Sequence, residues 1–352
     1  VSWEPFGVGG GRVSIVCQVF CGVTAHAPLA IRRDAAEWRA LVASAAMIVR
    51  PRLHWFRLLF VWRGSVLPYI ANRLLLVLAV SVLSVLGRDW WLSAHAASAL
   101  SIPPFTLMGI ALAIFLGFRN TVSYDRYWEA RKQWGALLIG ARSLTREVAS
   151  FAPDEPDLQR RAVRMLAAFV FALKHQLRGT DPQADLACRL DPAVLERVRG
   201  ARFVPSALLL CLAREFAAAR RAGSLTDLQL QATDANLNLL TEASGACERI
   251  ANTPIPFTYQ VLMNRTVMVY SLLLPIGLAP SIGWLTVLVG PFIAYTFLAL
   301  DVIGEQIEEP FGREPNDLAL GAMCHAIELS ICELVGEQPL SGPPEVMDYV
   351  MD

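Results

Sequence analysis

The sequence carries little charge for its length and no excess of either sign. Of its 352 residues, 18% are Asp, Glu, Lys or Arg, and 31 basic side chains balance 31 acidic ones. A nucleic-acid-binding protein needs a basic excess, so we expect no nucleic acid among its partners. With 55% hydrophobic residues, the chain is also too apolar to be disordered.

The sequence has few of the patterns that catalysis or metal binding requires. Its seven cysteines form no C-x-x-C pair, and an odd, scattered set fits reduced thiols better than a disulfide framework. P-loop, G-x-S-x-G and H-E-x-x-H motifs are missing. His325 and Glu328 share a helical face, but one such pair is too little for a di-iron site. An enzyme is therefore the weaker class, and we expect no required cofactor.

Long apolar runs are what the sequence has in abundance. The mean hydropathy over the whole chain is +0.43. Four runs approach the roughly 20 apolar residues that a hydrocarbon core demands. We therefore predict four transmembrane helices, over residues 65–86, 96–118, 259–278 and 282–300.

Arginines indicate how these runs are oriented. Arg50 and Arg57 precede the first run, whereas Arg119 and Arg126 follow the second. The uncharged loop 279–281 lies between the last two runs. By the positive-inside rule, both termini and the long middle segment lie in the cytoplasm.

The middle segment is patterned as helices. Residues 205–221 form an amphipathic run that stops at Gly223, and 228–250 form another. Asp191 before Pro192 is a typical helix start, and no alternating run suggests a sheet. We therefore predict an all-α membrane protein with a large cytosolic helical region.

The expected organisation has five segments. The first is a poorly structured extension, for which we hypothesise an over-extended gene start with Met47 as the natural first residue. An N-terminal cytosolic segment with the first two transmembrane helices follows, then the cytosolic helical region, the last two transmembrane helices and an acidic cytosolic end. Their ranges are 1–46, 47–126, 127–252, 253–304 and 305–352.

The second apolar run carries two stripes. Gly109, Ala113 and Gly117 recur every four residues, a small-residue pattern that lets another helix approach closely. About 100° further around the helix lies a stripe that consists of Ile110, Ile114 and Phe118. This second stripe is either lipid-facing bulk or a hydrophobic constriction that stops ions by dewetting. A constriction would require several subunits, because four helices of one chain fill their own centre.

Four blocks of the sequence resemble the bestrophin family in its bacterial branch. They are residues 47–65, 109–131, 247–257 and 305–317. The resemblance implies a pentameric ion channel with an axial pore in the bacterial inner membrane. It places three neck side chains on Ile110, Ile114 and Phe118, and a second aperture at the cytosolic mouth, where Leu228 is our candidate.

Animal relatives in this family carry a calcium-binding clasp after a Pro-Phe-Gly sequence. Here Glu314 and Asp317 match its acidic positions, and Glu309 could add an oxygen. Arg313 and Pro315 dilute the run, and calcium prefers many oxygen ligands. A helix-end turn with surface charges is the alternative, so calcium binding is doubtful.

The sign of the conducted ion depends on the acidic end of the chain. Residues 301–352 hold twelve Asp and Glu but one Arg, Arg313. They form either a solvated tail or a funnel that enriches cations at a pore exit. We expect passive conduction of small monovalent ions with a cation preference. A chloride or other anion channel is the alternative, and a membrane-anchored interaction scaffold is the alternative of another class.

Overall fold

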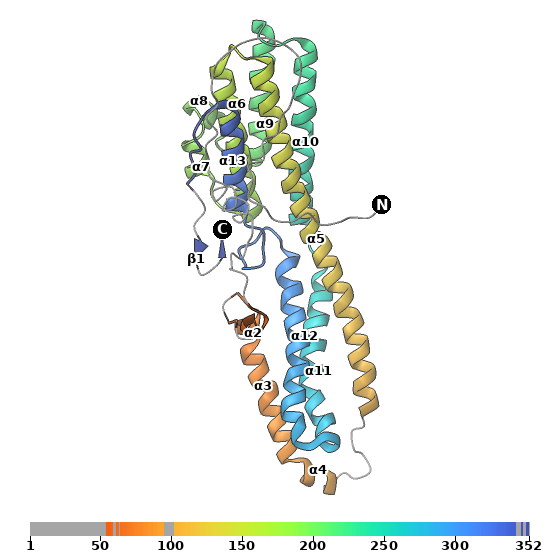
Figure 1. Cartoon of the computed structure of the whole chain (residues 1–352). Helices are drawn as coiled ribbons and strands as arrows, with labels where there is room; N and C mark the ends of the chain where they lie inside the picture. Colours follow the sequence, from red (N-terminus) through yellow and green to blue (C-terminus); the bar gives the residue numbers. More distant parts are fainter. Residues whose placement is uncertain are drawn as a thin grey trace, which may run out of the picture.

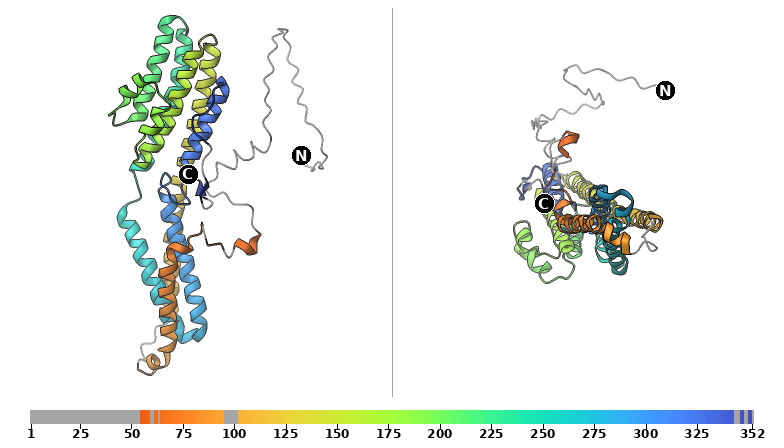
Figure 2. Two further views of the ribbon diagram at one scale, coloured as in Figure 1. Left: turned by 90° about the vertical axis from the view of Figure 1, so that its left-hand side faces the viewer. Right: turned by 90° about the horizontal axis from the view of Figure 1, so that it is seen from below.

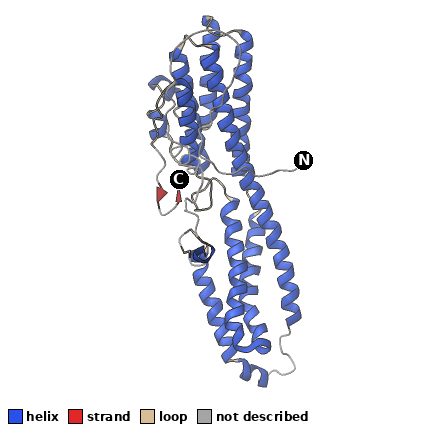
Figure 3. Ribbon diagram, in the orientation of Figure 1, coloured by secondary structure: helices blue, strands red, loops and turns tan. Residues whose placement is uncertain are grey.

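The computed structural model describes residues 54–58, 61–62, 64–94, 102–342, 346–347 and 350–351. The prediction for residues 1–46 lies outside these ranges. The described chain is almost entirely helical and elongated, with an apolar half at one end and a helical bundle at the other (Figures 1 and 3). A side view shows that the two parts stack end to end (Figure 2).

The apolar half contains three stretches that, within the described residues, are long and apolar enough to cross a membrane. They are Leu67–Leu86, Pro103–Phe151 and Phe257–Glu308. In the single chain only 17%, 22% and 28% of their apolar windows are buried. Lipid or further copies of the chain must therefore cover the rest.

The third stretch is folded back on itself, so that two helices lie side by side (Figure 1). The short helix η2 separates them at the reversal. The elements of the apolar half are α2 (Trp55–Leu58), α3 (Leu67–Leu86), α4 (Arg88–Ala94), the first part of α5 (Ile102–Phe151), α11 (Phe257–Ile282), η2 (Gly283–Leu285) and α12 (Thr286–Glu308).

The helix α5 belongs to both parts. At 50 residues and 1.5 Å per residue it is roughly 75 Å long. Its second part packs along α10, with α13 and α6 beside them (Figure 1). The elements of the bundle are α6 (Pro156–Arg178), α7 (Gln183–Ala187), α8 (Pro192–Val198), α9 (Val204–Ala222), α10 (Asp227–Asn252) and α13 (Leu320–Val335), followed by strands β1 (Val346–Met347) and β2 (Val350–Met351).

Helix ends in the bundle follow the local sequence. Gly223 ends α9 with a φ of 87°, a left-handed conformation that glycine adopts without a Cβ penalty. Thr226 then starts α10, because its hydroxyl accepts from the Gln229 amide and the Gln229 side chain reaches back. The predicted stop at Gly223 and the predicted helix over 228–250 are confirmed.

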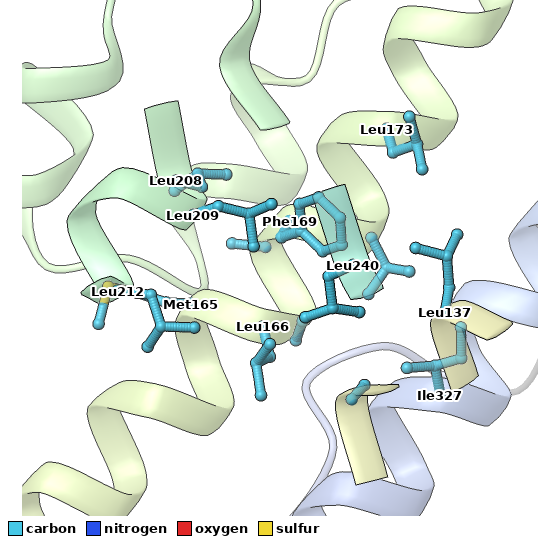
Figure 4. Close-up of a cluster of buried hydrophobic side chains, with 14 of the residues drawn as sticks. Leu137, Met165, Leu166, Phe169, Leu173, Leu208, Leu209, Leu212, Leu240 and Ile327 are labelled. Carbon is cyan, nitrogen blue, oxygen red and sulfur yellow. The ribbon is translucent and has the colours of Figure 1, made fainter. Parts of the chain in front are cut away.

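Each half has its own hydrophobic core. In the bundle, leucines of α6, α9 and α10 surround Phe169 and meet Leu137 of α5 and Ile327 of α13 (Figure 4). In the apolar half, Leu112 and Leu116 of α5 contribute to a second core with residues of α3, α11 and α12. The two cores give α5 a buried inner face along most of its length.

Three sequence expectations need correction. The predicted loop 279–281 lies inside α11, and the chain reverses three residues later, where Gly283 has a φ of 54°. Pro280 is tolerated within α11, as prolines are in membrane helices. Asp191 stands before Pro192 as predicted, but its side chain makes no capping hydrogen bond. A two-residue strand pair near the end of the chain was not expected.

Candidate functional site

The predicted Ile/Phe stripe lies on the uncovered face of α5. The exposed fractions of Ile110, Ile114 and Phe118 are 56%, 52% and 65%. Leu112 and Leu116, on the opposite face, are 2% and 1% exposed. Two residues correspond to about 200° around a helix, so the sequence itself separates the two faces. The stripe is therefore free to face either lipid or another copy of the chain.

The small-residue stripe beside it is only partly used within the subunit. A Cβ on Gly109 would lie 2.6 Å from the Tyr270 hydroxyl oxygen on α11, so glycine is needed for this contact. Ala113 is exposed, and a Cβ on Gly117 would meet nothing within 4 Å. Gly109 thus packs closely against α11, whereas Ala113 and Gly117 face no other helix of the described subunit closely.

A buried charge network begins one residue beyond the Ile/Phe stripe. Arg119, 2% exposed, pairs through Nη1 with Asp301, which is 1% exposed, and its Nη2 lies 3.6 Å from Glu308 Oε2. Among the described residues, Nε and Nη2 of Arg119 have no hydrogen-bond partner. The network ties α5 to α12 where the apolar stripe ends.

Leu228, the candidate for the second aperture, lies far from the Ile/Phe stripe. It is in the first turn of α10 and 79% exposed. That end of α10 is at the outer tip of the bundle (Figure 1). Beside it, Asp227 accepts a hydrogen bond of 2.5 Å from Arg220, and this contact lowers the pKa of Asp227.

The three candidate calcium ligands come together at one cavity between the two halves. Glu309, Glu314 and Asp317 all line this cavity of about 770 Å³. The Glu314 amide donates to Asp317 Oδ2 at 2.7 Å, and the Tyr69 hydroxyl donates to Glu314 Oε2 at 3.0 Å. Burial, helped by Glu314 and Glu309, raises the pKa of Asp317 to about 7.

These contacts do not make a calcium cage. Within the described residues, no group of three or more His, Cys, Asp or Glu side chains is arranged to hold a metal ion. Glu314 accepts from Tyr69 of α3, and Asp317 accepts from the Glu314 amide through Oδ2 while its buried Oδ1 has no hydrogen-bond partner among the described residues. Calcium takes six to eight oxygen ligands, more than these three side chains supply. Calcium binding at this turn and the absence of a required cofactor both stay predictions.

The acidic end of the chain is not a free row of charges. Glu328 is buried and accepts hydrogen bonds from Arg189 at 2.8 and 3.0 Å. Glu337 pairs with Arg160 at 2.7 Å. Among the described residues of this segment, the buried carboxylates are Asp301, Glu308, Asp317 and Glu328. Much of the negative charge that the sequence count suggested is therefore compensated or hidden within the subunit.

Sequence reasoning missed the network around Arg119. It treated Arg119 only as a marker of orientation, and it counted Asp301 only among the acidic residues at the end of the chain. The available signal was one basic and one acidic residue, each directly after an apolar run. Such charges usually pair within the bundle, but the sequence alone does not say which partner each one takes.

The comparisons with known proteins agree on one family. The family model of the bacterial and fungal bestrophin proteins matches residues 47–333. The voltage-dependent anion channel-forming protein RSc3414 of Ralstonia nicotianae is 46% identical over 309 residues, which cover 87% of this chain and 100% of the relative. YneE of Escherichia coli, which carries the same channel-forming name, is 41% identical over 292 residues, 83% of this chain and 95% of the relative.

A solved structure agrees with the sequence matches. The bacterial bestrophin homologue of Klebsiella pneumoniae is 41% identical, with a TM-score of 0.74 over 77% of this chain and 100% of that one. The resemblance drawn from the four sequence blocks is confirmed, as is the all-α membrane fold class.

The Gly109 contact yields a test of the subunit packing. Gly109→Ala should lower the stability by about 1–3 kcal/mol, because the added methyl group would overlap the Tyr270 hydroxyl. Adding Tyr270→Phe should restore most of the loss, since it removes the overlapping oxygen. Gly135→Ala, on the same helix, is the matched control and should not destabilise the protein, because its Cβ meets nothing within 4 Å. Thermal unfolding of the detergent-solubilised protein measures all three, and equal losses for both alanine variants would contradict the packing described.

Proposed function

The chain belongs to the bacterial and fungal bestrophin family, and we propose on this basis that it forms a passive ion channel. Several copies surround a central pore that small monovalent ions cross. The observation that carries the proposal is the Ile/Phe stripe of α5, which the described residues of its own subunit leave exposed. The relatives' names, which describe channel-forming proteins, support the same activity.

The neck of this channel consists of Ile110, Ile114 and Phe118. Three apolar side chains one helical turn apart form three stacked rings when several copies of α5 meet around an axis. Such rings hinder ions by excluding water rather than by charge. The open Ala113 and Gly117 positions beside them allow a neighbouring copy to approach closely. Five copies, the number in the family resemblance, are proposed.

We propose that the channel prefers anions, the alternative that the sequence left open. The cation preference was based on the acidic end of the chain, and several of those carboxylates are buried or paired with Arg119, Arg160 and Arg189. A compensated carboxylate attracts few mobile cations. The related proteins are named for anion channels, which supports chloride as a permeant ion.

The membrane placement follows the arginine pattern. Four crossings by α3, the first part of α5, α11 and α12 put both termini and the bundle in the cytoplasm of a bacterial inner membrane. Leu228 then lies at the cytosolic tip, where it is proposed as the second aperture. A bundle placed there extends the ion pathway well beyond the bilayer.

The first test is the reversal potential of the purified protein in a planar bilayer with unequal KCl concentrations. The expected value lies near the chloride equilibrium potential. A value near the potassium equilibrium potential would contradict the anion preference and restore the cation interpretation. A protein that is folded and inserted but passes no current would contradict the channel itself.

Truncating the side chain that forms one of the rings tests the proposed neck. Ile114→Ala should raise the conductance at least about twofold, because a wider and less apolar ring wets more easily. Leu83→Ala is the matched control: Leu83 is 67% exposed but lies on α3, away from the neck, so its truncation should leave conductance unchanged. Single-channel recording gives the conductance, and an unchanged Ile114→Ala channel would remove Ile114 from the neck.

A further inference from the structure

The buried cation Arg119 directly follows the neck residue Phe118 in sequence. Its guanidinium pairs with Asp301 and approaches Glu308, both on α12. Removing one partner of a buried ion pair leaves an uncompensated charge, which is costly. The two helices therefore have to keep these groups together, and this constrains how α5 can turn against α12.

A second arginine of the same face adds to this contact. Arg126 lies seven residues after Arg119, two helical turns along. Its Nε donates to the Glu308 carbonyl oxygen at 3.1 Å, and its Nη2 donates to the Ile250 carbonyl oxygen at 2.7 Å. Its Nη1 donates to the Thr253 carbonyl oxygen. These bonds hold α5 to the end of α12 and to the end of α10.

Between the two arginines the helices meet without spare room. A Cβ on Gly304 of α12 would overlap the Asn120 side-chain oxygen and lie 4.0 Å from Arg119 Nε. Neither α5 nor α12 can slide past this point without breaking the contacts on either side. We call this set the polar lock: Arg119, Asn120, Arg126, Asp301, Gly304 and Glu308.

Elsewhere on the neck helix, the Tyr259 hydroxyl donates to the Phe115 carbonyl oxygen at 3.3 Å, and Gly109 packs against Tyr270. Leu112 and Leu116 pack there against other apolar side chains. Apolar packing is largely non-directional, whereas a guanidinium fork imposes a fixed geometry on its partners. The polar lock therefore adds a charged contact of fixed geometry to the restraints on the rotation of α5 about its own axis.

We infer that Arg119 is a positioning residue for the neck: its pair with Asp301 fixes the rotation of α5 and so holds Ile114 and Phe118 toward the pore axis. The inference rests on the proposed channel function. In this inference, an ion pair buried within the subunit controls which side chains of α5 line the proposed pore.

Two cysteine reporters make the rotation measurable. The background replaces Cys17, Cys21 and the exposed Cys188 with Ser, and keeps the four buried cysteines. Ile114→Cys reports the pore-facing side of α5, and Leu116→Cys reports its buried side. Both react with a charged, water-soluble thiol reagent in proteoliposomes, and mass spectrometry gives the two rates. The current is recorded in parallel.

Arg119→Met together with Asp301→Leu removes the central ion pair of the lock. Glu308, which Arg119 also approaches, keeps Arg126 nearby. The ratio of the two rates, Ile114→Cys over Leu116→Cys, should fall by about tenfold, because other rotations of the helix become populated. Arg119→Lys, which keeps the charge but lacks the guanidinium fork, should give an intermediate ratio. Should the double variant fail to fold, Asp301→Asn is measured, with a smaller fall expected.

The matched control removes a buried ion pair that does not involve α5. Arg189→Met with Glu328→Leu does so in the bundle, where the side chains are 2% and 1% exposed. It should leave the ratio unchanged, although it too alters a buried pair. A ratio that stays the same in a folded lock-free variant, while the reagent still blocks current at Ile114→Cys, overturns the positioning role alone. Modification at Ile114→Cys that never affects the current overturns the proposed neck, and this inference with it.

Discussion

The uncovered face of α5 is the constraint on which the rest of the structure depends. Its inner face contributes to both hydrophobic cores, through Leu112 and Leu116 in the apolar half and through Leu137 in the bundle. Its outer face keeps Ile114 and Phe118 more than half exposed. No described element of the single chain covers that stripe, which leaves it open to lipid or to other copies of the chain. The proposed pore is the arrangement in which the stripe also has a function.

At the polar lock, one side of α5 is anchored to α12 while the opposite side stays exposed. A long helix that joins a membrane to a cytosolic bundle needs a fixed point, and charges at the boundary provide one with defined geometry. Arg119 points inward while Phe118, the residue before it, points outward. The spacing of 100° per residue thus couples the anchored side of the helix to the exposed side. A shift of the anchor would move the neck with it.

The positions of the helices could be predicted from the sequence more accurately than the chain reversal and the ion pairs between helices. Apolar runs and the stop at Gly223 located α3, α9 and α10, because these signals are local. The reversal after α11 was misplaced, since Pro280 is a breaker in water but not in a membrane helix. The acidic count over 301–352 suggested a cation funnel, yet Glu328 and Asp301 find arginines far away in the chain. Whether a charged side chain is unpaired depends on partners that are distant in the sequence, and the sequence alone does not predict which partner each charge takes.

The most direct test of this account is an electron-microscopy reconstruction of the purified full-length protein in lipid nanodiscs. The account predicts a closed ring of copies in which α5 lines the axis and Ile110, Ile114 and Phe118 face it. A single copy in the disc, or a ring with this stripe turned toward lipid and another helix on the axis, would contradict it.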